Sequence, residues 1–161
     1  MAKKKKIGFD ILIYDSFEAL KKSDRTLLEK SMEARGNAYA PYSNFQVGAA
    51  LELENGEIVI GSNQENASYP SGLCAERVAV FYAGAKFPNV AIKTLAISVQ
   101  SKNSEVLEPA APCGNCRQSL FEYEHRQKSP IRILMMGAQG KVVECPSVAA
   151  ILPLGFDKTY L

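Results

Sequence analysis

Residues 45–60 have the sequence FQVGAALELENGEIVI, and this stretch predicts a β-hairpin. From Phe45 to Leu53 apolar side chains recur at every second position, which is the pattern of a half-buried strand. Asn55 and Gly56 come next and predict a type I′ turn. Glu57 to Ile60 then predict the returning strand. This hairpin is the local element from which the rest of the fold can be placed.

On both sides of the hairpin, the sequence predicts helices that alternate with strands. Ser23 or Asp24 can cap a helix that runs to Arg35, and Gly36-Asn37 can end it. Longer helices are predicted at residues 74–85 and 114–126, and strands at residues 94–99, 131–136 and 142–143. A short final helix is predicted at residues 147–152. This order of elements predicts one α/β sheet layered with helices.

The composition is that of one ordinary globular domain: 161 residues, 47% hydrophobic and 22% charged. It excludes a disordered chain, a collagen-like chain and a coiled coil, and no run approaches the ~20 apolar residues of a membrane span. Without the four lysines at positions 3–6, the formal charge of +2 becomes −2. Such a body lacks the clustered basic residues that bind nucleic acid. Asp10 and Asp15 interrupt the segment that follows the lysines, so we expect a cytoplasmic protein and not an exported one.

Four cysteines suggest a metal site. Cys113 and Cys116 form a C-x-x-C pair, which in a cytoplasmic protein indicates metal binding or redox chemistry. With Cys74 they supply three thiolates, and the chain offers no obvious fourth ligand, because His125 lies on a polar stretch. An open fourth position is what a catalytic zinc keeps for water. Cys145 is expected to be a small buried residue.

The three candidate ligands lie where loops enter predicted helices. Backbone N–H groups and the helix dipole stabilise anionic thiolates at such places. Cys113 and Cys116 share a helix face, and Cys74 can approach from the other helix. Glu76 is placed beside the ion without binding it, which suits proton transfer. Three thiolates and Zn²⁺ carry a net negative charge, so Arg77 is a candidate to withdraw charge from a ligand sulfur.

The motif Cys74-Ala75-Glu76, followed by Pro112-Cys113-Gly114-Asn115-Cys116, is the three-cysteine form of the zinc nucleobase deaminase signature. Together with its flanking motifs, it makes the chain resemble the small cytidine deaminases that act on free nucleosides. The matching stretches are residues 40–45, 47–50, 63–70, 74–77, 112–118 and 152–153, with Phe156. The resemblance covers about residues 24 to 156.

The resemblance implies a three-layer α/β/α fold with a mixed sheet of about five strands. It divides the chain into an N-terminal extension with a Lys-rich start, residues 1–22, and one catalytic domain, residues 23–161. It also implies a homotetramer with shared active sites, in which Tyr69 and Phe156 reach into a neighbouring subunit's pocket. The extension and Gln46, which stands where proline is common, depart from the family pattern.

For the site, the resemblance implies one Zn²⁺ per chain, held by Cys74, Cys113 and Cys116. Glu76 would shuttle protons while cytidine or deoxycytidine is hydrolysed to uridine or deoxyuridine and ammonia, a reaction of pyrimidine salvage. The implied substrate contacts are Phe45 on the pyrimidine, the Ala75 N–H on the base carbonyl, and Asn63 and Glu65 on the sugar 3′-hydroxyl. These two residues address a hydroxyl common to both nucleosides, so the choice between them stays open.

Three other functions are compatible with parts of the sequence. A modified or antibiotic cytosine nucleoside could replace cytidine with the same chemistry. A polynucleotide deaminase needs a basic groove and stacking aromatic residues, and the acidic body argues against it. A zinc module without catalysis would leave Glu76 without a purpose. We therefore expect a small nucleoside substrate and neither a nucleic acid nor a membrane as partner.

Overall fold

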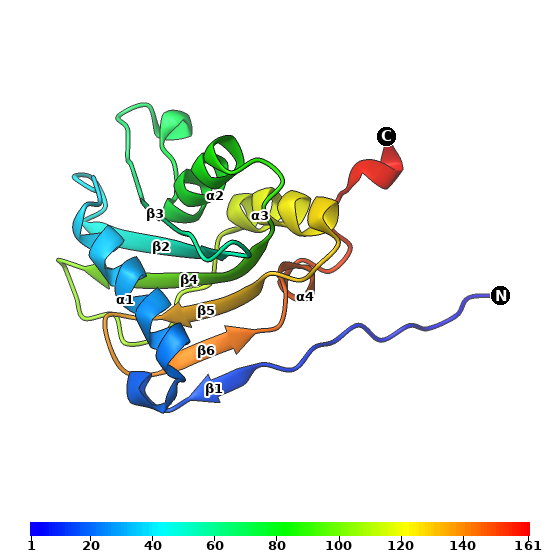
Figure 1. Ribbon diagram of the computed structural model, residues 1–161, viewed down its shortest axis with the longest axis horizontal. Coiled ribbons are helices and arrows are strands. Elements are labelled where there is room, and N and C mark those ends of the chain that lie inside the picture. The colour runs from blue at the N-terminus through cyan, green and yellow to red at the C-terminus, as the bar shows by residue number, and fades with distance from the viewer.

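A computed structural model describes residues 1–161 as one six-stranded sheet with helices on both faces (Figure 1). The strands are β1 (Leu12–Tyr14), β2 (Phe45–Leu53), β3 (Ile58–Ser62), β4 (Ile92–Ser101), β5 (Arg132–Met136) and β6 (Val142–Cys145). The helices are α1 (Lys22–Gly36), α2 (Ala75–Lys86), α3 (Gly114–Gln127) and α4 (Val148–Ile151). Short 3₁₀ turns lie at Phe17–Ala19, Tyr69–Ser71 and Lys158–Tyr160. The sheet order is β1-β6-β5-β4-β2-β3, and the β4–β5 pair alone is parallel.

The strands bury alternate residues on opposite faces of the sheet, and this produces the three layers. Ala49 and Leu51 of β2 belong to the larger core cluster, under α2, α3 and α4. Ala50 between them belongs to the second cluster, under α1, together with Leu28 and Leu134. The prediction of a three-layer α/β/α fold with a mixed sheet is therefore confirmed, with six strands in place of about five.

Two glycines allow the helices to approach the sheet closely. A Cβ atom on Gly48 of β2 would lie 1.8 Å from the carbonyl oxygen of Ser31 in α1. On the other face, a Cβ atom on Gly61 of β3 would lie 2.6 Å from the backbone nitrogen of Ala79 in α2. Because α2 is pressed onto β3 in this way, its first turn has a fixed position beside the sheet.

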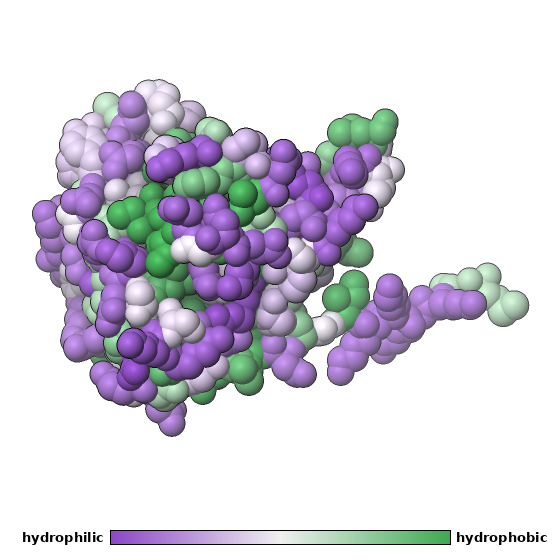
Figure 2. Space-filling view, in the orientation of Figure 1, coloured by the Kyte–Doolittle hydropathy of each residue, from purple (hydrophilic) through white to green (hydrophobic).

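The sixth strand, β1, comes from the N-terminal segment, and the sequence patterns did not predict it. Leu12–Tyr14 pair antiparallel with Val142–Glu144, and the Tyr14 hydroxyl donates to Glu144 Oε2 at 2.9 Å. Leu20 is buried in the cluster under α1. Residues before β1 form an extended arm that stands clear of the body, with a hydrophilic stretch in its middle (Figures 1 and 2). The division of the chain at residues 22 and 23 stays a prediction.

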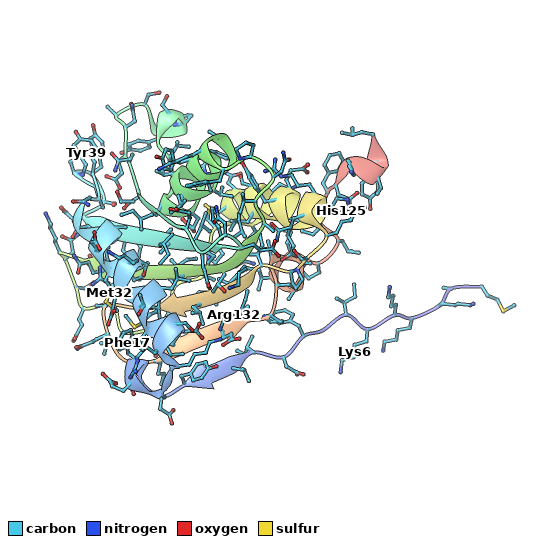
Figure 3. The ribbon with its side chains drawn as sticks, in the orientation of Figure 1. Lys6, Phe17, Met32, Tyr39, His125 and Arg132 are labelled. Carbon is cyan, nitrogen blue, oxygen red and sulfur yellow. The ribbon has the colours of Figure 1, made fainter.

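The predicted cap of the first helix is wrong. Helix α1 begins after Lys21, and no side chain caps its first turn. Asp24 instead lies inside that turn, only 4% exposed. Its carboxylate accepts two hydrogen bonds, one of them 2.7 Å long, from the guanidinium of Arg132 on β5. Figure 3 labels Arg132. A buried bidentate ion pair is a stronger interaction than a helix cap, so it decides where Asp24 points.

The predicted hairpin is confirmed, but its turn is not of type I′. Type I′ requires positive φ at both central residues, and Gly56 has φ +84° while Asn55 is not among the residues with positive φ. Gly56 N–H donates to Leu53 O and Leu53 N–H donates to Glu57 O, both at 3.0 Å. This is a three-residue loop, a type I turn followed by a left-handed glycine.

Each helix is too short or too polar to span a lipid bilayer.

Candidate active site

Three sulfur atoms meet where the N-termini of α2 and α3 lie side by side. Cys74 and Cys113 are the N-cap residues of these helices, and Cys116 lies in the first turn of α3. The Sγ atoms are 3.9 Å apart for Cys74 and Cys113 and 3.5 Å apart for Cys113 and Cys116, and all three lie within 4.8 Å of one another. Tetrahedral zinc with Zn–S bonds of about 2.3 Å needs sulfurs about 3.8 Å apart. The three cysteines therefore fit zinc.

The surroundings of Cys74 favour its thiolate. Hydrogen bonding from the Cys116 thiol, and then from Arg77, lowers the pKa of Cys74 to about 5. The Arg77 Nη2 atom lies 3.8 Å from Cys74 Sγ. This is a contact of the kind expected of Arg77, and its effect on the ion stays a prediction. A thiolate is the form in which cysteine binds metals.

Glu76 lies next to the sulfurs and is not part of their cluster. It is the second residue of α2, and its side chain is only 4% exposed. Burial raises the pKa of Glu76, and the nearby Cys74 charge adds to this. A carboxyl group that has a raised pKa and no ion pair is a stronger base than an exposed one, which suits proton transfer.

A cavity of about 650 Å³ opens beside the sulfurs and Glu76. Most of the residues expected to bind substrate or metal line it. These are Phe45, Asn63, Glu65, Tyr69, Cys74, Glu76, Arg77 and Cys113. They come from β2, from the segment after β3, and from the starts of α2 and α3, so segments that are distant in sequence converge on one hollow. Its volume is in the range of small-molecule sites.

Asn63 and Glu65 hold the wall of the cavity through backbone groups. The Asn63 side chain accepts from Val47 N–H at 2.8 Å and donates to Phe45 O at 2.9 Å, so it is fixed along β2. The Glu65 carboxylate accepts from the backbone of Tyr42 at 2.9 Å and from the Ser43 hydroxyl. That hydroxyl is the main cause of the lowered pKa of Glu65. Glu65 is therefore an ionised acceptor at neutral pH.

The comparison with protein families decides what kind of site this is. The family model described as the cytidine and deoxycytidylate deaminase zinc-binding region matches residues 21–129, which include the three clustered cysteines, Glu65 and Glu76. The chain belongs to this deaminase family. The resemblance expected from the motifs is thereby confirmed, and with it the expectation of a zinc-dependent hydrolase.

Individual deaminases of known sequence agree. A cytidine deaminase of Halalkalibacterium halodurans is 37% identical over 132 residues, which are 81% of this chain and 91% of that protein. The cytidine deaminase of Sporosarcina psychrophila is also 37% identical over 132 residues, 82% of this chain and 90% of the relative.

Solved deaminase structures share the fold. The crystal structure of cytidine deaminase from Burkholderia pseudomallei is 37% identical, with a TM-score of 0.72, and covers 85% of this chain and all of that one. The enzyme from Mycobacterium leprae is 33% identical, with a TM-score of 0.60, over 80% of this chain and 95% of its own.

Three expected residues do not line the deaminase cavity. Ala75 and Cys116 are fully buried behind its wall. Phe156 is 56% exposed and stacks on Tyr160, with ring centroids 5.5 Å apart, away from this chain's own cavity. Its expected place in a neighbouring subunit's pocket stays a prediction.

The sequence motifs predicted no individual binding role for Tyr42 or Ser43, but both residues line the cavity and donate hydrogen bonds to Glu65. They lie in the stretch of residues 40–45 that carries the family resemblance, and this was the signal that could have identified them. Tyr42 also packs edge-on against Tyr69, with ring centroids 6.1 Å apart. The two rings form the outer part of the cavity wall.

Proposed function

We propose that this chain hydrolyses the 4-amino group of cytidine and deoxycytidine, giving uridine or deoxyuridine and ammonia in pyrimidine salvage. One observation carries the proposal: Glu76 is buried in a cavity beside three clustered sulfurs and is neither a member of that cluster nor paired with a cation. Relatives that are 37% identical over most of this chain are named cytidine deaminases.

Cys74, Cys113 and Cys116 would hold the zinc ion. When bound, zinc supplies a Lewis acid that makes water nucleophilic near neutral pH. Arg77 offsets part of the negative charge of the ligand set through its contact with Cys74. The N-termini of α2 and α3 act in the same direction, because each helix begins at a cysteine, at the positive end of the helix dipole.

Glu76 would move the protons of the reaction. It accepts one from the attacking water and delivers it to N3 of the pyrimidine while the oxygen adds to C4. It then takes the proton of the new C4 hydroxyl and passes it to the amino group, so that ammonia leaves and the C4 carbonyl forms. The burial that raises its pKa favours this exchange, because it makes the carboxylate a stronger base toward the attacking water.

The remaining residues would orient the nucleoside. Phe45 packs on the base, and the Ala75 N–H, the first of α2, binds the base carbonyl. Glu65 accepts a hydrogen bond from the 3′-hydroxyl, and Asn63 keeps one amide N–H beyond its bond to Phe45. Both contacts suit ribose and deoxyribose alike, so we propose both substrates.

We further propose that the enzyme is a cytoplasmic homotetramer. Tyr69 and Phe156 are 77% and 56% exposed, as is expected of side chains that enter a neighbour's pocket. Three thiolates on one ion need the reducing conditions of the cytoplasm. Light scattering on the purified protein tests the assembly, and a monomer with full activity would contradict it.

The decisive experiment compares Glu76→Gln with Glu29→Gln, a control on the exposed face of α1. We expect Glu76→Gln to keep one zinc per chain and to lose turnover of cytidine by about 10²- to 10⁴-fold, as for loss of a general acid–base group. Glu29→Gln should match the wild type. Wild-type turnover by Glu76→Gln would rule the assignment out. A panel of cytidine, deoxycytidine, cytosine and a short single-stranded DNA identifies the substrate.

A further inference from the structure

Arg35 is a buried cation with no carboxylate partner. It lies in the last turn of α1 and is 9% exposed. None of the six ion pairs in the structure includes it. Its Nη1 atom donates instead to two backbone carbonyls, Val99 O at 3.0 Å and Gly137 O at 3.4 Å. A guanidinium is costly to bury without hydrogen bonds, so these two carbonyls stabilise Arg35 inside the fold.

The two carbonyls lie at the point where the parallel strands β4 and β5 separate. The last pair in their register is Ser98 with Met136, and the residues that follow are Val99 and Gly137. Beyond this point β4 continues along β2 to Ser101, while the chain turns away after β5. We call this point, at Val99 and Gly137, the fork. Arg35 therefore donates hydrogen bonds on both sides of the fork. The carboxyl ends of parallel strands are also where ligand crevices form in α/β sheets.

The fork supports the loop that leads to the metal ligands. A Cβ atom on Gly137 would lie 2.5 Å from Val106 O and 2.7 Å from Leu107 O, so the loop backbone rests directly on this glycine. Ala138 N–H donates to Val106 O at 2.7 Å. The same loop continues through Ala110 and Ala111, which line the cavity, to Cys113.

We propose that Arg35 is a positioning residue that sets the cavity wall formed by residues 99–111. It acts through Gly137 and the loop backbone, and it touches neither the substrate nor the sulfurs. Val99 and Ile97 of the same strand also line the cavity, so a shift of the fork moves that wall relative to Glu76, which lines the cavity from α2. The inference rests on the proposed function only for its kinetic readout.

The test compares Arg35→Met with Arg132→Met. Both remove a largely buried guanidinium, but Arg132 bonds to Asp24, Glu144 and Thr94 and not to the carbonyls of Val99 and Gly137. For Arg35→Met we expect KM for cytidine to rise about tenfold and kcat to change by less than about threefold, the pattern of lost substrate fit. Zinc per chain should stay at one. Arg35→Lys should restore part of the affinity, since an ammonium can still reach one carbonyl.

Two outcomes overturn the proposal. One is a KM within about twofold of the wild type in a folded Arg35→Met enzyme, and the other is loss of zinc together with kcat. If Arg35→Met does not fold, Gly137→Ala provides the same test, because its Cβ pushes on the loop from the fork. It should raise KM, and an unchanged KM there also overturns the proposal.

Hydrogen exchange separates this inference from the proposed function. In Arg35→Met, the amides of residues 102–111 should exchange faster than in the wild type, and in Arg132→Met they should not. A wild-type protein that leaves cytidine intact defeats the proposed function and does not affect this readout. Unchanged exchange in the loop defeats the positioning role of Arg35, whatever the substrate.

Discussion

Glu76 and Asp24 are two acids in equivalent places with opposite surroundings. Each lies in the first turn of a helix, α2 for Glu76 and α1 for Asp24, and each is 4% exposed. Asp24 is paired with the Arg132 guanidinium through both carboxylate oxygens. Glu76 has no ion pair, and its burial raises its pKa.

The difference shows what separates a structural acid from a chemical one. Burial alone does not distinguish them, and neither does position on a helix. A bidentate arginine engages both carboxylate oxygens of Asp24 and holds the group in place. Glu76 has no such partner and lines a cavity, which is the setting expected of an acid that exchanges protons. The acid of α1 thus holds its helix to β5, and the acid of α2 is left facing the cavity.

The largest expected effect is that of metal removal. The active site needs an ion to satisfy three sulfurs, whereas both core clusters are apolar and complete within the chain. Dialysis against a chelator should therefore abolish cytidine turnover and leave the far-ultraviolet circular dichroism spectrum of the fold. Added Zn²⁺ should restore activity. Full activity in a preparation that elemental analysis finds metal-free would contradict the site.

Asp24→Asn should affect stability and not catalysis. The substitution leaves Arg132 with Glu144 as its one acidic partner. Breaking a buried pair costs about 3–5 kcal/mol, and because the guanidinium is 23% exposed we expect the lower end of that range. Urea denaturation measures the loss, with Asp10→Asn on the exposed arm as the matched control. A fall in kcat well below the melting temperature would show that the network serves the active site after all.

The smallest expected effect is that of Tyr14→Phe, which removes the hydroxyl bond to Glu144. We expect a loss of about 1 kcal/mol in the free energy of unfolding. That bond is the main cause of the raised pKa of Tyr14. The neutral phenol therefore stabilises the fold at pH values below about 10, the ordinary pKa of tyrosine. This contribution is lost as the pH rises through the raised pKa of the folded state.

Urea denaturation between pH 8 and about pH 11 tests this, in the range where phenols titrate. The wild type should lose more stability over this interval than Tyr14→Phe. Parallel curves for the two proteins would show that β1 does not depend on this contact.

Much of the fold follows from local patterns in the sequence. The alternation in Phe45–Leu53 predicts β2 with its observed bounds, and the helices after Cys74 and Cys113 begin within one residue of their predicted starts. Strand β1 could not be predicted in this way. Its three residues carry too short a pattern, and they become a strand because the edge of β6 offers unpaired backbone groups.

The residues of the site also fall into two groups, those that sequence motifs predict and those that only tertiary contacts reveal. The motifs around Cys74 and Cys113 point to the metal ligands and to Glu76, because the spacing of these residues carries the chemistry. The role of Ser43 in holding Glu65, and of Gly137 under the loop before Cys113, depends on contacts between segments that are far apart in the chain. No spacing rule reports such contacts.

By itself, the sequence predicted the candidate ligand set, the acid beside it and the layered α/β architecture. All of these depend on residue type and on short-range period. Tertiary structure alone decided that Asp24 pairs with Arg132, 108 positions away, and that Arg35 lies at the fork between β4 and β5. The physical reason is that a buried charge takes its partner from whatever the packed chain brings within hydrogen-bond distance, and separation along the sequence does not limit that choice.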